Sequence, residues 1–446
     1  MMSRLFHNCT YSFIFWSVLS SLVYAYFSHV VIRHEHLKLG LCIGLLFVAY
    51  YFMLKIPVKT SFLLGVGLLF RLIFLFSIPN LSQDFYRFIW DGRVLLSGLN
   101  PYLFSPTEVL DTSHGLFAHM QDLYHGMGAL STQHFSNYPP FHQIPFVLAA
   151  MISGKSIMGS VVLFRILMIL ADVGIVIFGK KLLSTLALPT KNIFYYFLNP
   201  LVIIELTGNL HFEGLMLLFL VLSLYFFYQN NIIRSAVYMS FSVLTKLLPL
   251  ILLPIVIYQL KPKKILRYVV LIAVLLAVFF MPFFEHEFLK NYGKTLGLWF
   301  TNFEFNSSIY SVMKRWTAHF LGLKLINYMP YIVPFLMTLI LMYFLQKKSI
   351  GKNSILVKSL WVLTFYFLIA TTVHPWYICN LVLLCCFTKY RFAVVWSGTV
   401  FLSYFAYHQN HVSDNIIGEV LEYSIFGGYL LYELIVQQRA KASSIS

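Results

Sequence analysis

Charged residues are scarce in this chain. Only 11 % of its 446 residues are Asp, Glu, Lys or Arg, whereas a soluble domain would carry about a quarter. Hydrophobic residues make up 59 %, and both Phe (44) and Tyr (29) are abundant. This balance excludes an ordinary soluble domain and indicates an α-helical membrane protein with aromatic residues at the membrane interfaces.

Acidic residues are the scarcer charge, with 16 Asp and Glu against 32 Lys and Arg. A basic balance can indicate nucleic-acid binding, but here the basic residues form short clusters between apolar runs and not one continuous face. The excess of Lys and Arg in the cytoplasmic loops of membrane proteins explains these clusters better. We therefore expect membrane lipids around the chain and no nucleic-acid partner.

Cysteine is also scarce, and its pattern indicates no metal site. The five cysteines lie in or beside apolar segments, at Cys9, Cys42, Cys379, Cys385 and Cys386. They form no CxxC and no Cys/His spacing typical of metal ligands. We expect neither a disulfide nor a metal, and no other cofactor. The sequence also lacks an internal repeat, which is a common feature of transporters.

Apolar runs that approach membrane-spanning length, about 20 residues, occur along most of the chain. The first is uncharged from Cys9 to Ile32 and is too long for a typical signal-peptide core, so we expect an uncleaved span. The candidate spans are 10–32, 38–55, 59–79, 157–179, 192–209, 211–229, 264–284, 325–346, 355–373, 375–388, 391–408 and 416–436. They predict an all-α polytopic membrane protein with about twelve crossings.

Two further apolar segments are predicted not to span. Residues 139–153 are about half a span long, and 234–259 carries Lys246 and Pro249 at its middle, where a broken helix pair would turn. If 139–153 is interfacial and 234–259 is a re-entrant hairpin, the Lys and Arg clusters fall on one side, the cytoplasm. Making either segment a full span would move about half of these clusters across the membrane.

This topology divides a single transmembrane domain, 1–446, into five parts. They are N-terminal spans (1–79), a large extracytoplasmic loop (80–156), central spans with the hairpin (157–284), a second extracytoplasmic loop (285–324) and C-terminal spans (325–446). Both termini are then cytoplasmic. The two loops are rich in Trp, Tyr, Asn and His, and most acidic residues fall on their side. We therefore expect the polar chemistry of the protein on the extracytoplasmic face.

The most concentrated charge cluster lies in residues 82–102. Asp84, Arg87 and Asp91 have the spacing of one helix face, which indicates an amphipathic helix at the membrane surface. One interpretation is a solvated face with an Arg87–Asp91 pair. The other is a catalytic carboxylate with Arg87 and Arg93 as cationic neighbours, because ionisable clusters at a membrane edge are functional candidates.

Six segments together carry a family resemblance. They are "QDFYRFIWDGRVLLSGLNPY" (83–102), "YPPFHQ" (138–143), "NPLVIIELTGNLHFEG" (199–214), "LTKLLPL" (244–250), "FEFNSSIY" (303–310) and "HPWY" (374–377). In this order they resemble bacterial multi-spanning mannosyltransferases of the GT-C glycosyltransferase superfamily. The resemblance implies an enzyme that transfers a hexose, mannose being the first expectation, from a polyprenyl-phosphate donor to a hydroxyl of a glycan or lipid acceptor. It also implies inversion and a periplasmic active site in a bacterial inner membrane.

In this superfamily an acidic residue of the first large loop is typically the catalytic base. Asp84 matches that position best, and Asp91 stays open as the alternative. Many relatives outside this group have paired acids, whereas Gln83 and Phe85 flank Asp84. The resemblance therefore does not imply a bound divalent metal.

Sugar transfer from a phosphodiester needs a base for the acceptor hydroxyl, cations for the leaving phosphate and an apolar groove for the lipid. Lys246 is the strongest phosphate candidate, because a lysine in an apolar stretch usually has a partner. Snorkelling or pairing with a helix end is the alternative. Arg87, Arg93 and His374 are further candidates for the phosphate.

The remaining candidates are expected to bind substrate. His211 and Glu213 could bind sugar hydroxyls or cap a helix, and Tyr138 and His142 lie on the interfacial segment. Two more are Asn306, in a polar loop that would shape the acceptor pocket, and Tyr377, which could also belong to an aromatic belt.

Three further expectations complete the set. Arg165 and Asp172 lie seven residues apart on one predicted span and are expected to pair. A transporter or lipid flippase is the rival from another class. A polysaccharide ligase or polymerase that uses an oligosaccharide-pyrophosphate donor is the rival within enzymes.

Overall fold

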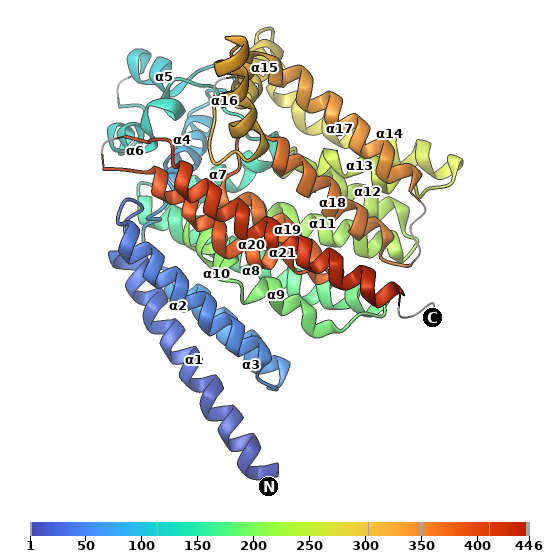
Figure 1. Cartoon of the computed structure of the whole chain (residues 1–446). Coiled ribbons are helices and arrows are strands. Elements are labelled where there is room, and N and C mark those ends of the chain that lie inside the picture. The colour runs from blue at the N-terminus through green and yellow to red at the C-terminus, as the bar shows by residue number, and fades with distance from the viewer. Residues whose placement is uncertain (1, 114, 302, 348–350, 410, 443–446) are drawn as a thin grey trace.

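The computed structural model describes residues 2–113, 115–301, 303–347, 351–409 and 411–442. Within these ranges all named secondary-structure elements are helices (Figure 1). The first half forms α1 (Met2–Val30), α2 (His36–Lys55), α3 (Thr60–Ile73), α4 (Asp84–Leu96), α5 (Pro106–Thr112), α6 (Met120–Thr132), α7 (Pro140–Ser153), α8 (Ile157–Thr185), η1 (Thr190–Ile193), α9 (Phe194–Phe197), α10 (Pro200–Val202), η2 (Ile203–Gly208) and α11 (Glu213–Tyr228). The second half forms α12 (Ile232–Thr245), η3 (Leu248–Ile251), α13 (Leu253–Ile257), α14 (Pro262–Phe280), η4 (Met281–Phe283), α15 (Phe288–Thr301), α16 (Ile309–Leu321), η5 (Leu325–Tyr328), α17 (Met329–Gln346), α18 (Ser354–Ile369), η6 (Pro375–Tyr377), α19 (Ile378–Cys386), α20 (Phe392–Thr399), η7 (Val400–Ala406) and α21 (Ile416–Ala442). The all-α prediction is confirmed.

Several of these helices have the length and composition of membrane spans. In the described part of the chain there are five, Cys9–Val30, His36–Lys55, Ile157–Thr185, Pro262–Phe283 and Leu325–Gln346. A sixth candidate is the pair Pro200–Gly208 and Glu213–Tyr228, bent by 114° at its break. Other apolar helices are shorter than a span. The chain is therefore an integral membrane protein, while twelve crossings and the re-entrant hairpin stay predictions.

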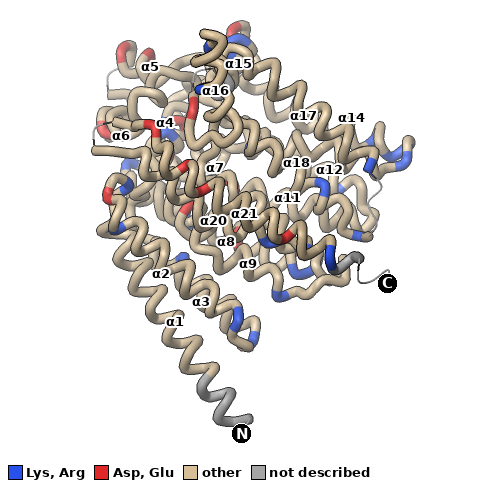
Figure 2. The backbone as a smooth tube through the Cα atoms, in the orientation of Figure 1, with Lys and Arg blue, Asp and Glu red and all other residues tan. Residues whose placement is uncertain are grey.

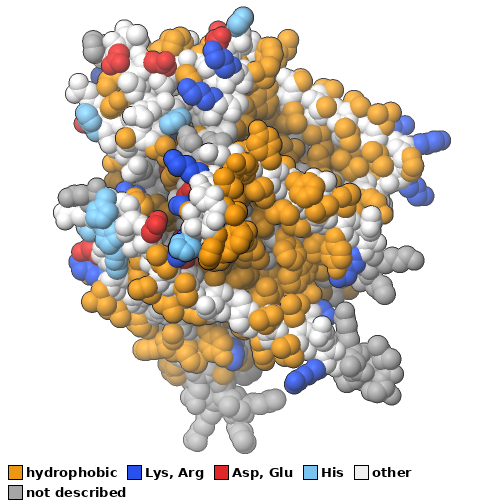
Figure 3. Space-filling view, turned by 45° about the horizontal axis from the view of Figure 1, so that its top comes forward, with side chains coloured by type: hydrophobic (Ala, Val, Ile, Leu, Met, Phe, Trp, Pro, Cys, Tyr) orange, Lys and Arg blue, Asp and Glu red, His pale blue; other side chains and the backbone are white. Residues whose placement is uncertain are grey.

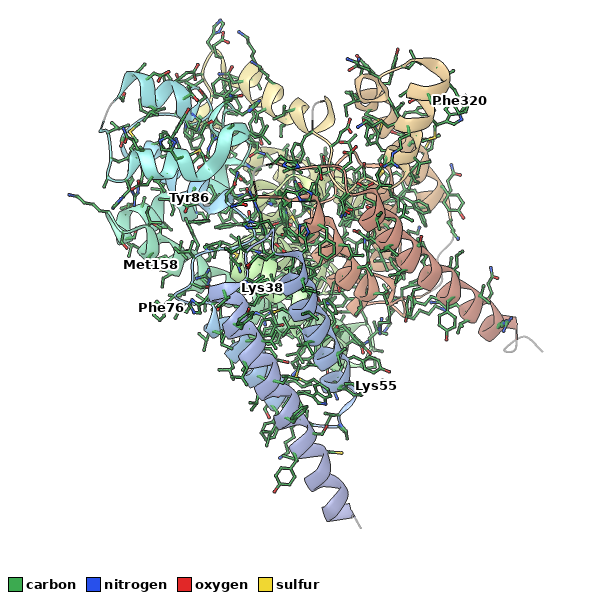
Figure 4. All side chains as sticks on the ribbon, turned by 60° about the vertical axis from the view of Figure 1, so that its left-hand side comes forward. Lys38, Lys55, Phe76, Tyr86, Met158 and Phe320 are labelled. Carbon is green, nitrogen blue, oxygen red and sulfur yellow. The ribbon has the colours of Figure 1, made fainter. Side chains whose placement is uncertain are left out.

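The helices are arranged as a bundle with a separate layer over one end. Helices α4, α5 and α6 lie in this layer, and α15 and α16 lie at the same end (Figure 1). Asp and Glu gather there, whereas Lys and Arg mark the α2–α3 and α13–α14 connections at the other end (Figure 2). Tyr86 and Phe320 lie at the layered end and Lys55 at the far end of α2 (Figure 4). Polar chemistry is thus concentrated at one end of the bundle.

Helix α4 lies inside this layer, with α6, α7 and α8 packed around it. Nine of its thirteen residues are buried. Gly92 permits the close approach to α7, because a Cβ there would lie 2.2 Å from the carbonyl oxygen of Phe146. The Phe88 ring stacks on the Phe146 ring with centroids 4.8 Å apart. Neighbouring helices cover this face at Arg87 and Asp91, so a solvated face is wrong there, although the Arg87–Asp91 pair expected with it is present.

Two buried arginines hold α3, α8, α9, the end of η2 and the segment that follows α3 together. Arg71 of α3 donates to Asp172 of α8 over 2.7 Å, and the Tyr196 hydroxyl donates to the same carboxylate over 2.8 Å. Arg165 donates to four backbone carbonyls at 2.7–3.0 Å, two in the segment before α4 and two near the end of η2. The predicted Arg165–Asp172 pair is wrong, because each side chain has other partners.

The segment 234–259 is broken at Lys246, as its proline and lysine predicted. Helix α12 ends at Thr245, and Lys246 is extended (φ −149°, ψ 143°) before η3 and α13. Helices α12 and α7 have 14 residues each, so each is about 21 Å long, against about 30 Å of hydrocarbon core. The break places Lys246 at the turn.

Candidate active site

One large cavity, with a volume of about 1010 Å³, lies between the start of α4, the start of α11, the turn after α12 and the loops before α16 and η6. Seven of the residues singled out from the sequence line it: Asp84, Tyr138, Glu213, Lys246, Asn306, His374 and Tyr377. The other five, Asp91, Arg87, Arg93, His142 and His211, are buried outside its lining. The cavity therefore brings together segments that lie almost 300 residues apart in sequence, from 84 to 377.

Asp84 is the first residue of α4, and its side chain is 39 % exposed. The segment before it is held on two sides. The Leu81 amide donates to Asn209 Oδ1 over 3.1 Å, and Gln83 Nε2 donates to the Met127 carbonyl over 3.0 Å. These bonds direct the first turn of α4 into the cavity.

Burial raises the pKa of Asp84 to about 6. The charge of Lys246 lowers this pKa, and the charge of Glu213 raises it further. At neutral pH the carboxylate is still mostly ionised. A carboxylate with this pKa is a stronger base than an ordinary aspartate, and it lies close to the working pH that general-base catalysis favours.

Asp91 has a different environment from Asp84. Its carboxylate is fully buried and accepts from Arg87 Nε over 2.6 Å. Arg87 also donates to the carbonyls of Ser131, at the end of α6, and His134, just after it. Arg93 donates to the carbonyls of Ala118 and Lys155. Arg87, Asp91 and Arg93 therefore hold the layer together, and in the described structure they do not reach the cavity.

Three stacked rings form one wall beside Asp84. His211 stacks on Trp376 with centroids 3.7 Å apart, and Trp376 stacks on His374 at 4.3 Å. His211 lies behind the cavity surface, and its Nδ1 is 3.8 Å from Asp84 Oδ2. Burial, followed by the charge of Lys246, lowers the pKa of His374 to about 3. At neutral pH His374 is a neutral hydrogen-bonding group.

Lys246 and Glu213 form an ion pair at the cavity surface. Lys246 is 22 % exposed and donates to Glu213 Oε1, while Glu213 is 1 % exposed at the first position of α11. The lysine thus combines pairing at a helix end, one of the two expected possibilities, with a position on the cavity wall. Its charge also acts on Asp84 and His374.

The other predicted residues separate into lining and packing positions. Tyr138, Tyr377 and Asn306 line the cavity. His142 is fully buried among aromatic rings, with centroids 4.4 Å from Phe212 and 4.9 Å from Phe146. His142 therefore belongs to the aromatic core beneath α4.

Three cationic residues of the cavity lining, Arg33, Lys314 and Arg315, were missed by the sequence reasoning. Arg33, between α1 and α2, lies over the Tyr407 ring at 4.5 Å and donates to Gln83. Lys314 of α16 pairs with Glu304. The only signal for Arg33 was its place in a connection on the same side as Asp84, while Lys314 lay in a segment with no recognised motif.

One arm of the cavity is apolar. It is lined by Leu247, Leu248, Leu250 and Ile251 beside Lys246, by Val333 and Met337 of α17 and by Phe367 of α18. Leu250 is 40 % exposed, so this arm is accessible at Leu250. Hydrophobic side chains cover much of the flank in Figure 3, whereas Asp, Glu and His gather toward one end. The cavity lining thus includes both charged and apolar side chains.

No group of three or more His, Cys, Asp or Glu side chains within the described ranges could hold a metal ion. The acids and imidazoles around Asp84 instead contact lysine, tyrosine, amide and tryptophan groups.

Comparison with known protein families identifies a matching family. A family model described as "Alpha-(1->6)-mannopyranosyltransferase, N-terminal domain" matches residues 17–261. This range includes Asp84, Glu213 and Lys246, whereas Asn306 and His374 lie beyond it. Searches of curated proteins and of solved structures found no match.

Proposed function

The chain belongs to the alpha-(1->6)-mannopyranosyltransferase family and is therefore a mannosyltransferase, and we propose that it transfers mannose from a polyprenyl phosphate to a hydroxyl of a glycan or glycolipid. The observation that carries this proposal is the composition of the cavity. A carboxylate (Asp84), a cation (Lys246) and an arm of apolar side chains line one space. These are the three groups that the reaction requires.

The apolar arm is the proposed site of the donor lipid. Its residues beside Lys246 are Leu247, Leu248, Leu250 and Ile251, and Val333 and Met337 of α17 belong to it too; Leu250 is exposed. A polyprenyl chain can enter from the bilayer along this path, while its phosphate stays at Lys246 as a charge-assisted partner. His374 can donate a hydrogen bond to the same phosphate.

Asp84 is the proposed general base. As the acceptor oxygen attacks C1 of the mannosyl group, Asp84 takes the hydroxyl proton, and the bond between C1 and the phosphate oxygen breaks with its electron pair on the phosphate. Lys246 stabilises the charge that develops there. One direct displacement inverts C1, so an α-linked product requires a β-linked donor.

We place the reaction on the extracytoplasmic face. The cavity is built from the acidic end of the bundle, while short loops rich in Lys and Arg lie at the other end (Figure 2). Loops with an excess of Lys and Arg face the cytoplasm. In a bacterium this arrangement faces the cavity toward the periplasm.

The donor class can be tested with the purified full-length protein in nanodiscs. Three radiolabelled donors are compared with one mannoside acceptor: polyprenyl-phosphate mannose, a nucleotide-linked mannose and an oligosaccharide pyrophosphate. We expect label in the acceptor from the polyprenyl phosphate alone. Transfer from either other donor, with none from the polyprenyl phosphate, would refute the proposal.

A further inference from the structure

Asn306 has a backbone conformation that L-amino acids rarely adopt. Its φ is 49°, in the left-handed region. The loop around it is fixed by two backbone bonds, from the Phe305 amide to Thr371 O (3.1 Å) and from the Val373 amide to Phe305 O (2.9 Å). Asn306 is 5 % exposed and lines the cavity. A buried non-glycine residue in this region is held by its surroundings, and such positions cluster at functional sites.

The contacts of Asn306 determine which way its amide faces. Nδ2 lies 3.2 Å from Glu422 Oε1 and 3.4 Å from the Val373 carbonyl oxygen. Both neighbours accept hydrogen bonds, so the NH2 group must face them and Oδ1 must face away. Within the described residues, Oδ1 has no hydrogen-bond partner.

Three residues behind Asn306 hold its side-chain amide and its backbone carbonyl in place. Glu422 Oε1 also accepts from Trp396 Nε1 over 2.7 Å, and the Tyr423 hydroxyl donates to the Asn306 carbonyl over 2.7 Å. Glu422 is fully buried and lies outside the cavity lining. These three residues, from α20 and α21, hold the amide of Asn306 in a position where Oδ1 is buried and has no hydrogen-bond partner among the described residues.

We propose that Asn306 Oδ1 accepts a hydrogen bond from one sugar hydroxyl and so makes the enzyme specific for a sugar that carries it. This inference rests on the proposed mannosyl transfer. A phosphate oxygen is a poor partner, because two acceptors facing each other repel. A site that binds a substrate hydroxyl with a buried acceptor discriminates strongly against analogues that lack the hydroxyl, since the acceptor is then left without a partner.

The hydroxyl can belong to the donor mannose or to the acceptor sugar. The test therefore uses two series of substrates, acceptors and donors that each lack one hydroxyl. Wild type is compared with Asn306→Gly, because glycine adopts a φ of 49° without strain. With wild type, we expect one analogue to have a kcat/KM about 10-fold or more below that of the complete substrate. With Asn306→Gly, the same analogue and the complete substrate should have nearly equal kcat/KM values. The series in which this occurs identifies the sugar.

Variants of Glu422 give a second test of the proposal. A general loss of structure would not reproduce the pattern of results expected for them. In Glu422→Gln the side-chain oxygen can still accept from Asn306 and Trp396, so discrimination should persist. In Glu422→Leu the Asn306 amide loses this partner and can rotate, so discrimination should fall as in Asn306→Gly. Thermal unfolding midpoints check that each variant is folded.

The inference is overturned if Asn306→Gly keeps the wild-type discrimination against every analogue. It is also overturned if wild type discriminates against none. These outcomes are distinct from a failure of the proposed function, in which wild type would transfer no mannose from the polyprenyl phosphate.

Discussion

Asp84 Oδ2 lies 3.8 Å from His211 Nδ1, and His211 Nε2 lies 3.5 Å from Glu205 Oε2. Glu205 in turn accepts from the hydroxyl of Tyr404 over 2.8 Å and from Asn209 over 3.2 Å. Asp84 is exposed to the cavity, while the groups behind it are buried. Buried polar side chains, those of His211, Glu205 and Asn209, thus lie behind the proposed base. Asn209 also holds the segment before α4.

Replacing Asp84 should remove the general base without removing the cavity. We expect Asp84→Asn to lower kcat by about 10²–10⁴-fold, the usual contribution of a positioned base. Mannose transfer by the purified protein at saturating donor measures this loss. The matched control is Asp111→Asn on α5, where the side chain is exposed, and its kcat should stay within twofold of wild type (about the precision expected for a surface change). Wild-type activity of Asp84→Asn would refute the base assignment.

The pH dependence should report the raised pKa of Asp84. The base works only when deprotonated, so kcat/KM should be level above a pKa of about 6 and fall about tenfold per pH unit below it. An aspartate with an ordinary pKa would keep its activity down to about pH 4. Rates between about pH 4.5 and 8 measure the profile, and recovery at neutral pH after acid exposure excludes unfolding. A level profile down to about pH 4.5 contradicts the prediction.

How far the sequence could predict this site is clearest at α4. Helical spacing placed Asp84 and Asp91 on one face, and α4 does begin at Asp84. The spacing could not show that the first turn faces the cavity while the second is covered, because the cover comes from α6 and α7. The close contact of Gly92 with Phe146 that brings α7 near joins residues 54 positions apart (146 − 92).

The ring stack shows the same limit over a longer distance. His211 and the "HPWY" segment were each recognised as candidates, but the His211–Trp376 contact joins residues 165 positions apart (376 − 211). Local patterns predict helices, breaks and charged residues because these depend on neighbours in sequence. Which charged residues face a common space depends on the packing of helices that are distant in sequence.

Lys246 should affect the donor more than the acceptor. A charge-assisted hydrogen bond contributes about 1.5–3 kcal/mol, so Lys246→Met should lower kcat/KM for the polyprenyl-phosphate donor by roughly 10- to 150-fold. Lys246→Arg, which keeps the charge, should lose less. The control is Lys290→Met on α15, because Lys290 is 76 % exposed. A change confined to the KM of the acceptor would contradict the assignment of Lys246 to the phosphate.

Replacing Asp91 should separate stability from catalysis. Asp91→Asn leaves the Arg87 guanidinium buried without its carboxylate, and breaking a buried ion pair costs about 3–5 kcal/mol. We expect a clearly lower thermal unfolding midpoint. The folded fraction should keep a kcat near that of wild type. It should also lose activity below a pH of about 6, as wild type does. The double variant Arg87→Met/Asp91→Asn should regain part of the stability, because no charge is then left without a partner. The opposite result, normal stability with transfer abolished in Asp91→Asn, would make Asp91 the base in place of Asp84.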